Sequence, residues 1–159
     1  MMNKSISRRS LIESLLKAMA VGAALPAIAR ADGVLPVLNI YKDPSCGCCG
    51  KWVEHLTANG LKGTVTDRKD MDAFKDSLGI PAALRSCHTA VYGQYWIEGH
   101  VPAAEMKALL EKKPKDVVGL AVPGMPSGSP GMEMGAKKDR YDVLAVRANG
   151  KTSVFSSHG

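Results

Sequence analysis

The chain has 159 residues and a formal net charge of +6, from 21 Lys and Arg against 15 Asp and Glu. Four of those six net positive charges lie within residues 1–31. The rest of the chain shows no basic stripe with interleaved aromatic side chains, which argues against nucleic-acid binding. The length suits one domain with a modest core.

Residues 1–31 have the pattern of an export signal. A positively charged start containing Arg8 and Arg9 precedes a mostly apolar run and the small-x-small sequence Ala29-Arg30-Ala31. The two arginines resemble a twin-arginine signal, and a general secretory signal is the alternative. The apolar run is shorter than the ~20 residues of a membrane span, so we expect no stable membrane insertion after cleavage. Residues 32–159 are then one domain in the periplasm, an oxidising compartment.

Seven elements are predicted next, because runs with strand or helix periodicity alternate with turn residues. Helices are indicated by apolar residues on one face, and strands by alternation or a short apolar run. The predicted strands cover 34–41, 61–70 and, as two strands joined near Gly93-Gln94, 88–99, while the predicted helices cover 50–60, 71–80 and 102–114.

The remaining residues are predicted to form a loop and a hairpin. Residues 117–140 are rich in Gly, Pro and Met and favour a long loop. Residues 141–157 favour a β-hairpin that turns at Asn149-Gly150. The preceding order β-α-β-α-β-β-α, with Cys-x-x-Cys between the first strand and the first helix, predicts a thioredoxin-like α/β fold.

This topology predicts where the cysteines meet. The first strand runs toward the start of the first helix, the third strand begins at that end, and the fourth finishes there. Three segments distant in sequence, 46–49, 87–88 and 98–100, should therefore converge on one edge. A helix N-terminus favours thiolate over thiol, and thiolates serve both disulfide exchange and soft metals.

The cysteines allow two kinds of chemistry. Cys46 and Cys49 have the spacing of the catalytic pair of a thiol–disulfide oxidoreductase. This interpretation leaves Cys48 and Cys87 surplus. The segment before the third strand also reads RSCHTA, without the proline that thioredoxin-like oxidoreductases usually have there.

Metal binding uses the cysteines better. Zinc could take Cys46, Cys49, Cys87 and His88, but Cys48 would then have no role. Neighbouring side chains diverge, so adjacent cysteines more easily bridge different ions. Thiolates bridging Cu(I) ions would use all four cysteines, and sulfur donors favour Cu(I). Copper, with more than one ion per chain as an open option, is therefore the preferred interpretation.

Methionines and histidines are weaker candidates. Met125 is the preferred thioether ligand among the loop methionines, because prolines flank it in PGMP, although these methionines are also suited to packing the loop. His88 and His100 lie at the predicted edge, as ligands or as structural hydrogen-bonding groups. His55 is expected at the surface, and His158 in a tail without a role.

Four blocks of the chain together resemble the small exported metal-binding proteins of the bacterial copper-resistance CopG type. They are YKDPSCGCCGKWVEHL, LRSCHTAVYGQYWIEGHVPA, GLAVPGMPSGSPGMEM and YDVLAVRANGKTSVF, within residues 35–156. The resemblance implies a thioredoxin-like domain and a role in copper tolerance in the periplasm. It also implies metal binding through Cys46, Cys48, Cys49 and Cys87. His88, His100 and Met125 match its CH, GH and GMP positions, whose roles it does not settle.

The sequence therefore predicts a periplasmic protein that binds Cu(I) through clustered cysteines. Its expected partners are copper ions and other periplasmic copper-handling proteins. A periplasmic thiol–disulfide oxidoreductase using Cys46 and Cys49 is the alternative, and a zinc-stabilised interaction module is a third. Whether the protein turns over copper or thiols as an enzyme stays open.

Overall fold

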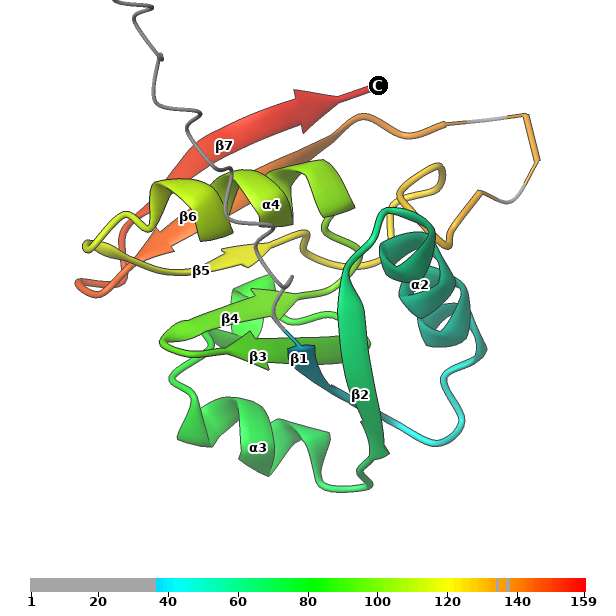
Figure 1. Ribbon diagram of the computed structural model, residues 1–159, viewed down its shortest axis with the longest axis horizontal. Coiled ribbons are helices and arrows are strands. Elements are labelled where there is room, and N and C mark those ends of the chain that lie inside the picture. The colour runs from blue at the N-terminus through cyan, green and yellow to red at the C-terminus, as the bar shows by residue number, and fades with distance from the viewer. Residues whose placement is uncertain (1–36, 134, 137) are drawn as a thin grey trace, which may run out of the picture. The chain divides into compact units, whose positions relative to one another are not determined.

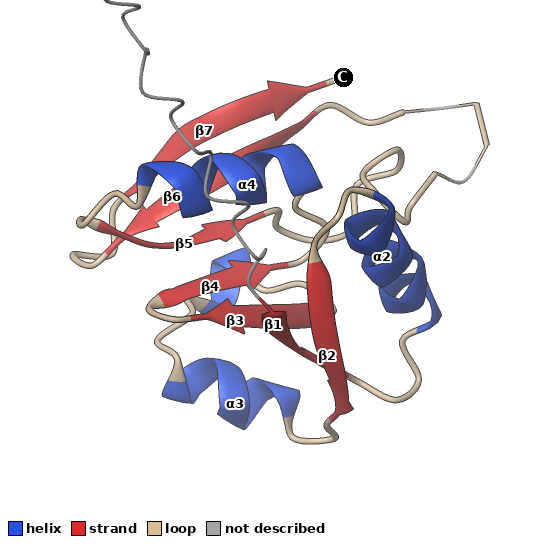
Figure 2. Ribbon diagram, in the orientation of Figure 1, coloured by secondary structure: helices blue, strands red, loops and turns tan. Residues whose placement is uncertain are grey.

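A computed structural model describes residues 37–133, 135–136 and 138–159. The predicted export signal, 1–31, lies outside the described residues, as do Met134 and the start of the first predicted strand. The described part has a mixed α/β fold in which seven strands form one sheet with three α-helices packed on it (Figures 1 and 2). None of the described helices is long and apolar enough to cross a membrane.

The sheet combines parallel and antiparallel neighbours in the order β2-β1-β3-β4-β5-β6-β7. β1 is parallel to β2 and β4 to β5, and the other neighbours are antiparallel. The strands are β1 Val37–Lys42, β2 Lys62–Asp67, β3 His88–Tyr92, β4 Tyr95–Glu98, β5 Val117–Ala121, β6 Tyr141–Arg147 and β7 Thr152–His158.

The helices cover both faces of the sheet. Helices α2 (Gly47–Ala58) and α4 (Ala103–Lys112) supply Trp52, Leu56, Met106 and Leu109 to the larger hydrophobic cluster. On the opposite face, α3 (Met71–Ser77) and a short 3₁₀ helix (Ala82–Leu84) flank a smaller cluster that includes Ile80, Leu84 and Trp96. Neighbouring side chains of β4 point into different clusters, as strand alternation requires.

Two differences from the predicted elements affect the site and the sheet. Helix α2 begins at Gly47 rather than residue 50, so two cysteines lie inside its first turn. The predicted loop at 117–140 begins with a strand, β5, and Gly119 belongs to this strand rather than to a loop. A Cβ at Gly119 would overlap the indole ring of Trp96. The Trp96 indole packs against the backbone of Gly119, so this position leaves no room for a side chain.

The pairing of β3 with β1 and β4 determines which residues meet at the edge of the sheet. Lys42, the last residue of β1, pairs with His88, the first of β3, and Thr89 pairs with Glu98, the last of β4. The end of β1, the start of β3 and the end of β4 therefore lie at one edge of the sheet, beside the N-terminus of α2. The predicted convergence of the three segments is confirmed.

Candidate metal site

The cysteines surround the start of helix α2. Cys46 occupies the N-cap position, where its side chain makes no capping hydrogen bond, and Cys48 and Cys49 lie in the first turn. Cys87 immediately precedes β3. The four sulfurs lie within 4.8 Å of one another, so the predicted single cysteine region is confirmed.

Two of the four sulfurs are joined. Cys46 and Cys49 form a disulfide, while Cys48 and Cys87 are free. The Sγ of Cys48 lies 3.5 Å from that of Cys46 and 3.9 Å from that of Cys87. The Cys48 sulfur is therefore in contact with the disulfide on one side and with the Cys87 sulfur on the other.

Cys87 also belongs to a second group of donor atoms. Its Sγ lies 3.2 Å from Nδ1 of His88 and 3.2 Å from Nε2 of His100. These three donor atoms lie within 4.8 Å of one another. Both histidines are fully buried, whereas Cys87 is only partly buried. Cys87 thus connects a sulfur-only group with a group of mixed sulfur and nitrogen donors.

The ring orientation of His100 is fixed by a loop carbonyl. Its Nδ1 lies 2.7 Å from the Pro130 oxygen, which can only accept a hydrogen bond. In the neutral imidazole the proton therefore sits on Nδ1, and the lone pair of Nε2 points toward the Cys87 sulfur. Metal-ligating histidines commonly donate their other nitrogen to a carbonyl in this way.

His88 offers a second lone pair but satisfies its other nitrogen less well. Its ring packs against Trp52 with centroids 4.2 Å apart and edge-on to His100 at 4.9 Å. Its Nε2 is buried and has no hydrogen-bond partner among the described residues. A buried polar atom left unpaired is costly, so the position is not explained by packing alone.

Burial sets the protonation states of this group. Burial raises the pKa of Cys87 to about 12, and the neighbouring Cys48 charge adds to the rise. Burial also lowers the pKa of His88 well below its ordinary value, with smaller contributions from His100 and Lys75, and lowers the pKa of His100. At neutral pH the imidazoles are neutral and the Cys87 thiol holds its proton. A metal ion binding there would displace that proton.

The predicted effect of the helix therefore does not extend to Cys87. The N-terminus of α2 was expected to favour thiolates among the cysteines it carries. Cys87 lies on another segment, and there desolvation outweighs any helix field.

The Gly/Pro loop covers one side of the site. Gly131 has a φ of +84°, and a Cβ there would lie 2.7 Å from the backbone nitrogen of Trp52 and 3.2 Å from the Cys48 oxygen. The loop therefore packs directly against the first turn of α2. Met125, which lies earlier in this loop, has 54% of its surface exposed, and its ligand role stays a prediction.

The other two histidines have structural partners. His55, expected at the surface, is half-buried, and its Nε2 accepts a hydrogen bond from the backbone N–H of Ala103 in the first turn of α4. His158, expected in a tail, belongs to β7 and donates from Nε2 to Glu105 at 2.8 Å. The expectation for His158 was wrong because its partner Glu105 lies about fifty residues away in sequence. His55 keeps part of its surface exposed, as expected, but also has a hydrogen-bond partner that the sequence did not indicate.

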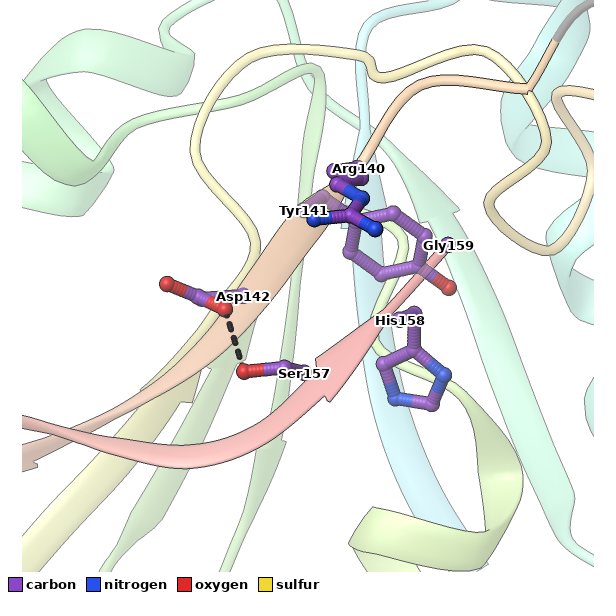
Figure 3. Close-up of a pocket in the computed structure, with 6 residues that line it drawn as sticks. All are labelled: Arg140, Tyr141, Asp142, Ser157, His158 and Gly159. Atoms are coloured by element: carbon purple, nitrogen blue, oxygen red, sulfur yellow. Dashed lines mark hydrogen bonds between the residues drawn. The ribbon is translucent and has the colours of Figure 1, made fainter.

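His158 also lines a separate pocket between the outer ends of β6 and β7. Its ring stacks on Tyr141 with centroids 4.9 Å apart, and Asp142 and Ser157 are hydrogen-bonded on the other side of the hairpin (Figure 3). No cysteine lines this pocket, which is formed by Arg140, Tyr141, Asp142, Ser157, His158 and Gly159.

Sequence reasoning missed an ion pair beside Cys87. Lys75 and Glu98 are both buried, and their side chains hold the residues on either side of Cys87 and His88. A lysine on a short helix gave no sign that it would be buried. For Glu98 the sequence indicates only a place at the end of a predicted strand.

Comparison with known proteins gives consistent results. Residues 84–132 match a family model described as a protein of unknown function, DUF411. Two solved structures titled copper resistance protein CopG are similar to this chain. Form 2 is 45% identical with a TM-score of 0.74, over 77% of this chain and 98% of that one. Form 1 is 46% identical with a TM-score of 0.73, over 77% and 96%. No curated protein matches the chain.

Proposed function

This chain belongs to the family of the copper resistance protein CopG, and from that premise we propose that it binds copper as Cu(I) through its clustered cysteines. The copper is cargo, taken up as part of copper resistance. The sequence resemblance and the cysteine cluster both support this function.

The observation that carries the proposal is the position of Cys87. Its sulfur is the one donor atom common to the group of four cysteines and to the group with His88 and His100. A thiolate has several lone pairs and can bridge two metal ions. The arrangement therefore suits more than one Cu(I) ion, with Cys87 as a bridge between a sulfur-rich position and a nitrogen-containing one.

The donor chemistry fits a soft monovalent ion. Thiolates favour Cu(I), and imidazole also suits copper. Nδ1 of His88 is the second imidazole nitrogen directed at Cys87, and in the neutral ring a lone pair on Nδ1 leaves the proton on Nε2, which has no partner among the described residues. The exposed thioether of Met125 is the candidate for completing a coordination shell from the loop side.

The disulfide adds a redox component to the proposal. Cys46 and Cys49 must be reduced by two electrons before all four cysteines can act as thiolates. In the opposite direction, their two thiolates can give one electron each to two Cu(II) ions, which forms the disulfide and two Cu(I) ions. No other oxidant is needed for that step.

A thiol–disulfide oxidoreductase remains the second candidate, because the disulfide has formed between the two cysteines with that spacing. In both cases we place the protein in the periplasm, where a disulfide can persist. We also infer a thioredoxin-like relationship for residues 37–112, because the element order and the antiparallel pairing of β3 with β1 and with β4 follow the predicted topology.

The test is an anaerobic Cu(I) titration of the reduced chain without its predicted signal, against a competing chelator, with copper per chain measured by elemental analysis. We expect tight binding of at least two ions per chain. Absence of tight binding, together with rapid disulfide exchange, would instead establish the oxidoreductase.

Two serine variants separate the candidates further. Cys48→Ser should lower copper stoichiometry if the cluster binds copper, but leave disulfide exchange intact if Cys46 and Cys49 are the working pair. Cys87→Ser should have the larger effect on copper, because it removes the donor common to both groups. Equal copper binding by both variants and the unchanged chain would contradict the proposal.

A further inference from the structure

A buried ion pair lies next to the segment that carries Cys87. Nζ of Lys75, on α3, is 2.6 Å from Oε1 of Glu98, the last residue of β4. The side chain of Lys75 is 3% exposed and that of Glu98 is fully buried. Neither element supplies a cysteine, so the pair is outside the proposed ligand set.

The Glu98 carboxylate holds the chain on both sides of Cys87 and His88. Its Oε1 accepts a hydrogen bond of 2.7 Å from the backbone N–H of Ser86. Its Oε2 accepts one of 2.6 Å from the hydroxyl of Thr89. One side chain therefore fixes the residue before and the residue after the two candidate ligands.

Lys75 completes this arrangement. Its ammonium donates to the backbone oxygen of Ser86 as well as to Glu98. Both backbone hydrogen-bonding groups of Ser86 are thus engaged by the pair. The Ser86 hydroxyl also donates to the Gly124 oxygen in the loop that covers the site. Ser86, which is not a candidate ligand, is therefore held through its backbone N–H, its backbone oxygen and its hydroxyl.

Close packing ties the same segment to the turn that carries His100. Gly99 has a φ of +73°, and a Cβ there would lie 2.7 Å from the Ser86 Cβ. The Gly99 N–H donates to the His88 oxygen at 3.0 Å. The segments bearing Cys87, His88 and His100 are therefore interlocked, and Glu98 is the side chain that joins them.

Stability does not explain this pair. Removing two charges from water is expensive, and well-packed apolar residues in place of a buried ion pair are often neutral or stabilising. A buried pair is better suited to fixing one arrangement of the chain. At this place, the arrangement keeps the Cys87 sulfur within 3.2 Å of a nitrogen of each imidazole.

We propose that Glu98 is a positioning residue for the metal site, with Lys75 neutralising its buried charge, and that it holds Ser86 and Thr89 so that Cys87 stays between His88 and His100. This inference rests on the proposed copper function, since it takes Cys87 as a ligand. Residues that orient metal ligands typically change metal affinity by roughly tenfold to a hundredfold when mutated.

Two matched double variants test the proposal. Lys75→Met with Glu98→Met removes the hydrogen bonds that the pair makes to Ser86 and Thr89 while keeping similar volume. Lys75→Met with Glu98→Gln also removes both charges, but keeps an acceptor for Ser86 and a polar group for Thr89. We expect roughly tenfold to a hundredfold weaker Cu(I) binding in the first and a loss of at most about threefold in the second.

A second measurement does not involve copper. In the reduced, copper-free chain, the alkylation rate of Cys87 relative to Cys48 is followed by peptide mass spectrometry, and thermal unfolding reports folding. We expect this ratio to rise at least about threefold in the first variant and to stay unchanged in the second. If the unchanged chain bound no copper, the proposed function would fail, but the alkylation ratios would still decide the positioning role.

The proposal is overturned if the methionine pair matches the unchanged chain in copper affinity and alkylation, or if both double variants are equally impaired. Should the methionine pair fail to fold, Thr89→Val and Thr89→Ser replace it. The valine removes one hydrogen bond to Glu98 and should weaken Cu(I) binding at least about threefold, while serine keeps the hydroxyl and should not. Equal affinities for these two variants would also overturn it.

Discussion

The four histidines divide between two regions that use the imidazole differently. At the cysteine edge, His88 and His100 each direct a nitrogen at the same thiol, 3.2 Å away. Around helix α4, His55 accepts from a backbone N–H and His158 donates to Glu105. In the first region two imidazole nitrogens face one thiol, whereas in the second the bonded nitrogens are paired with groups that support the fold.

The difference lies in what the ring nitrogens meet. Pro130 fixes one nitrogen of His100 and leaves the other directed at sulfur, which preorganises a ligand. The bonded nitrogens of His55 and His158 are already paired with protein groups, so using them for a metal would first break a hydrogen bond. Exposure alone would not separate the regions, because fully buried residues are the better ligand candidates here.

The largest expected effect comes from His100. His100→Leu removes the ring whose Nδ1 is held by the Pro130 oxygen and whose Nε2 is directed at Cys87, so we expect Cu(I) affinity to fall at least about tenfold. His55→Leu, a matched control, should change it by less than about twofold. Competition titration measures both. Equal losses of Cu(I) affinity in the two variants would show that the two regions do not differ in copper binding.

A smaller effect is expected from His55 on stability. His55→Leu leaves the Ala103 N–H at the start of α4 without its acceptor, which should lower the free energy of unfolding by about 1 kcal/mol near neutral pH. Urea unfolding of both proteins measures the loss.

The same variant should show a pH dependence. Burial lowers the pKa of His55 below its ordinary 6.5, and only the neutral ring can accept the hydrogen bond. Its contribution is complete above about pH 6.5 and is lost as the pH falls through the lowered folded-state pKa. The stability gap should therefore narrow in acid. A gap that stayed constant would show that the hydrogen bond does not support the fold.

The smallest effect is expected from His158. His158→Ala removes the hydrogen bond to Glu105 and the stack on Tyr141 at a partly exposed site, so the free energy of unfolding should fall by only about 0.5 kcal/mol. Thermal or urea unfolding measures this, with Cu(I) titration alongside. A loss of copper affinity as large as that of His100→Leu would mean that the hairpin belongs to the site.

Much of the cysteine site could be predicted from the sequence. The spacing of Cys46, Cys48 and Cys49 is local, and their position before a helix follows from local periodicity. Strand direction then places Cys87 and His100 at the same edge, because consecutive antiparallel strands must begin and end together. These steps need only element order, which the described residues confirm apart from β5 and the start of α2.

Other features gave no sequence signal. Gly119 belongs to a strand because Trp96 packs on it, but in the sequence it resembles the glycines of the loop that follows. Lys75 is buried because Glu98 and the Ser86 oxygen meet its ammonium. Side-chain partners of this kind depend on packing between distant segments, which neither periodicity nor composition records.

The sequence by itself determined the soft-donor chemistry and the edge at which it gathers, since thiol spacing and strand order are properties of the chain. Only the tertiary structure decided which atoms share a ligand position. Cys87 became common to two donor groups, the Pro130 carbonyl fixed the His100 ring, and Glu98 fixed the residues flanking Cys87 and His88. The reason is physical: a donor set depends on distances of a few ångströms, and packing and buried hydrogen bonds set those distances.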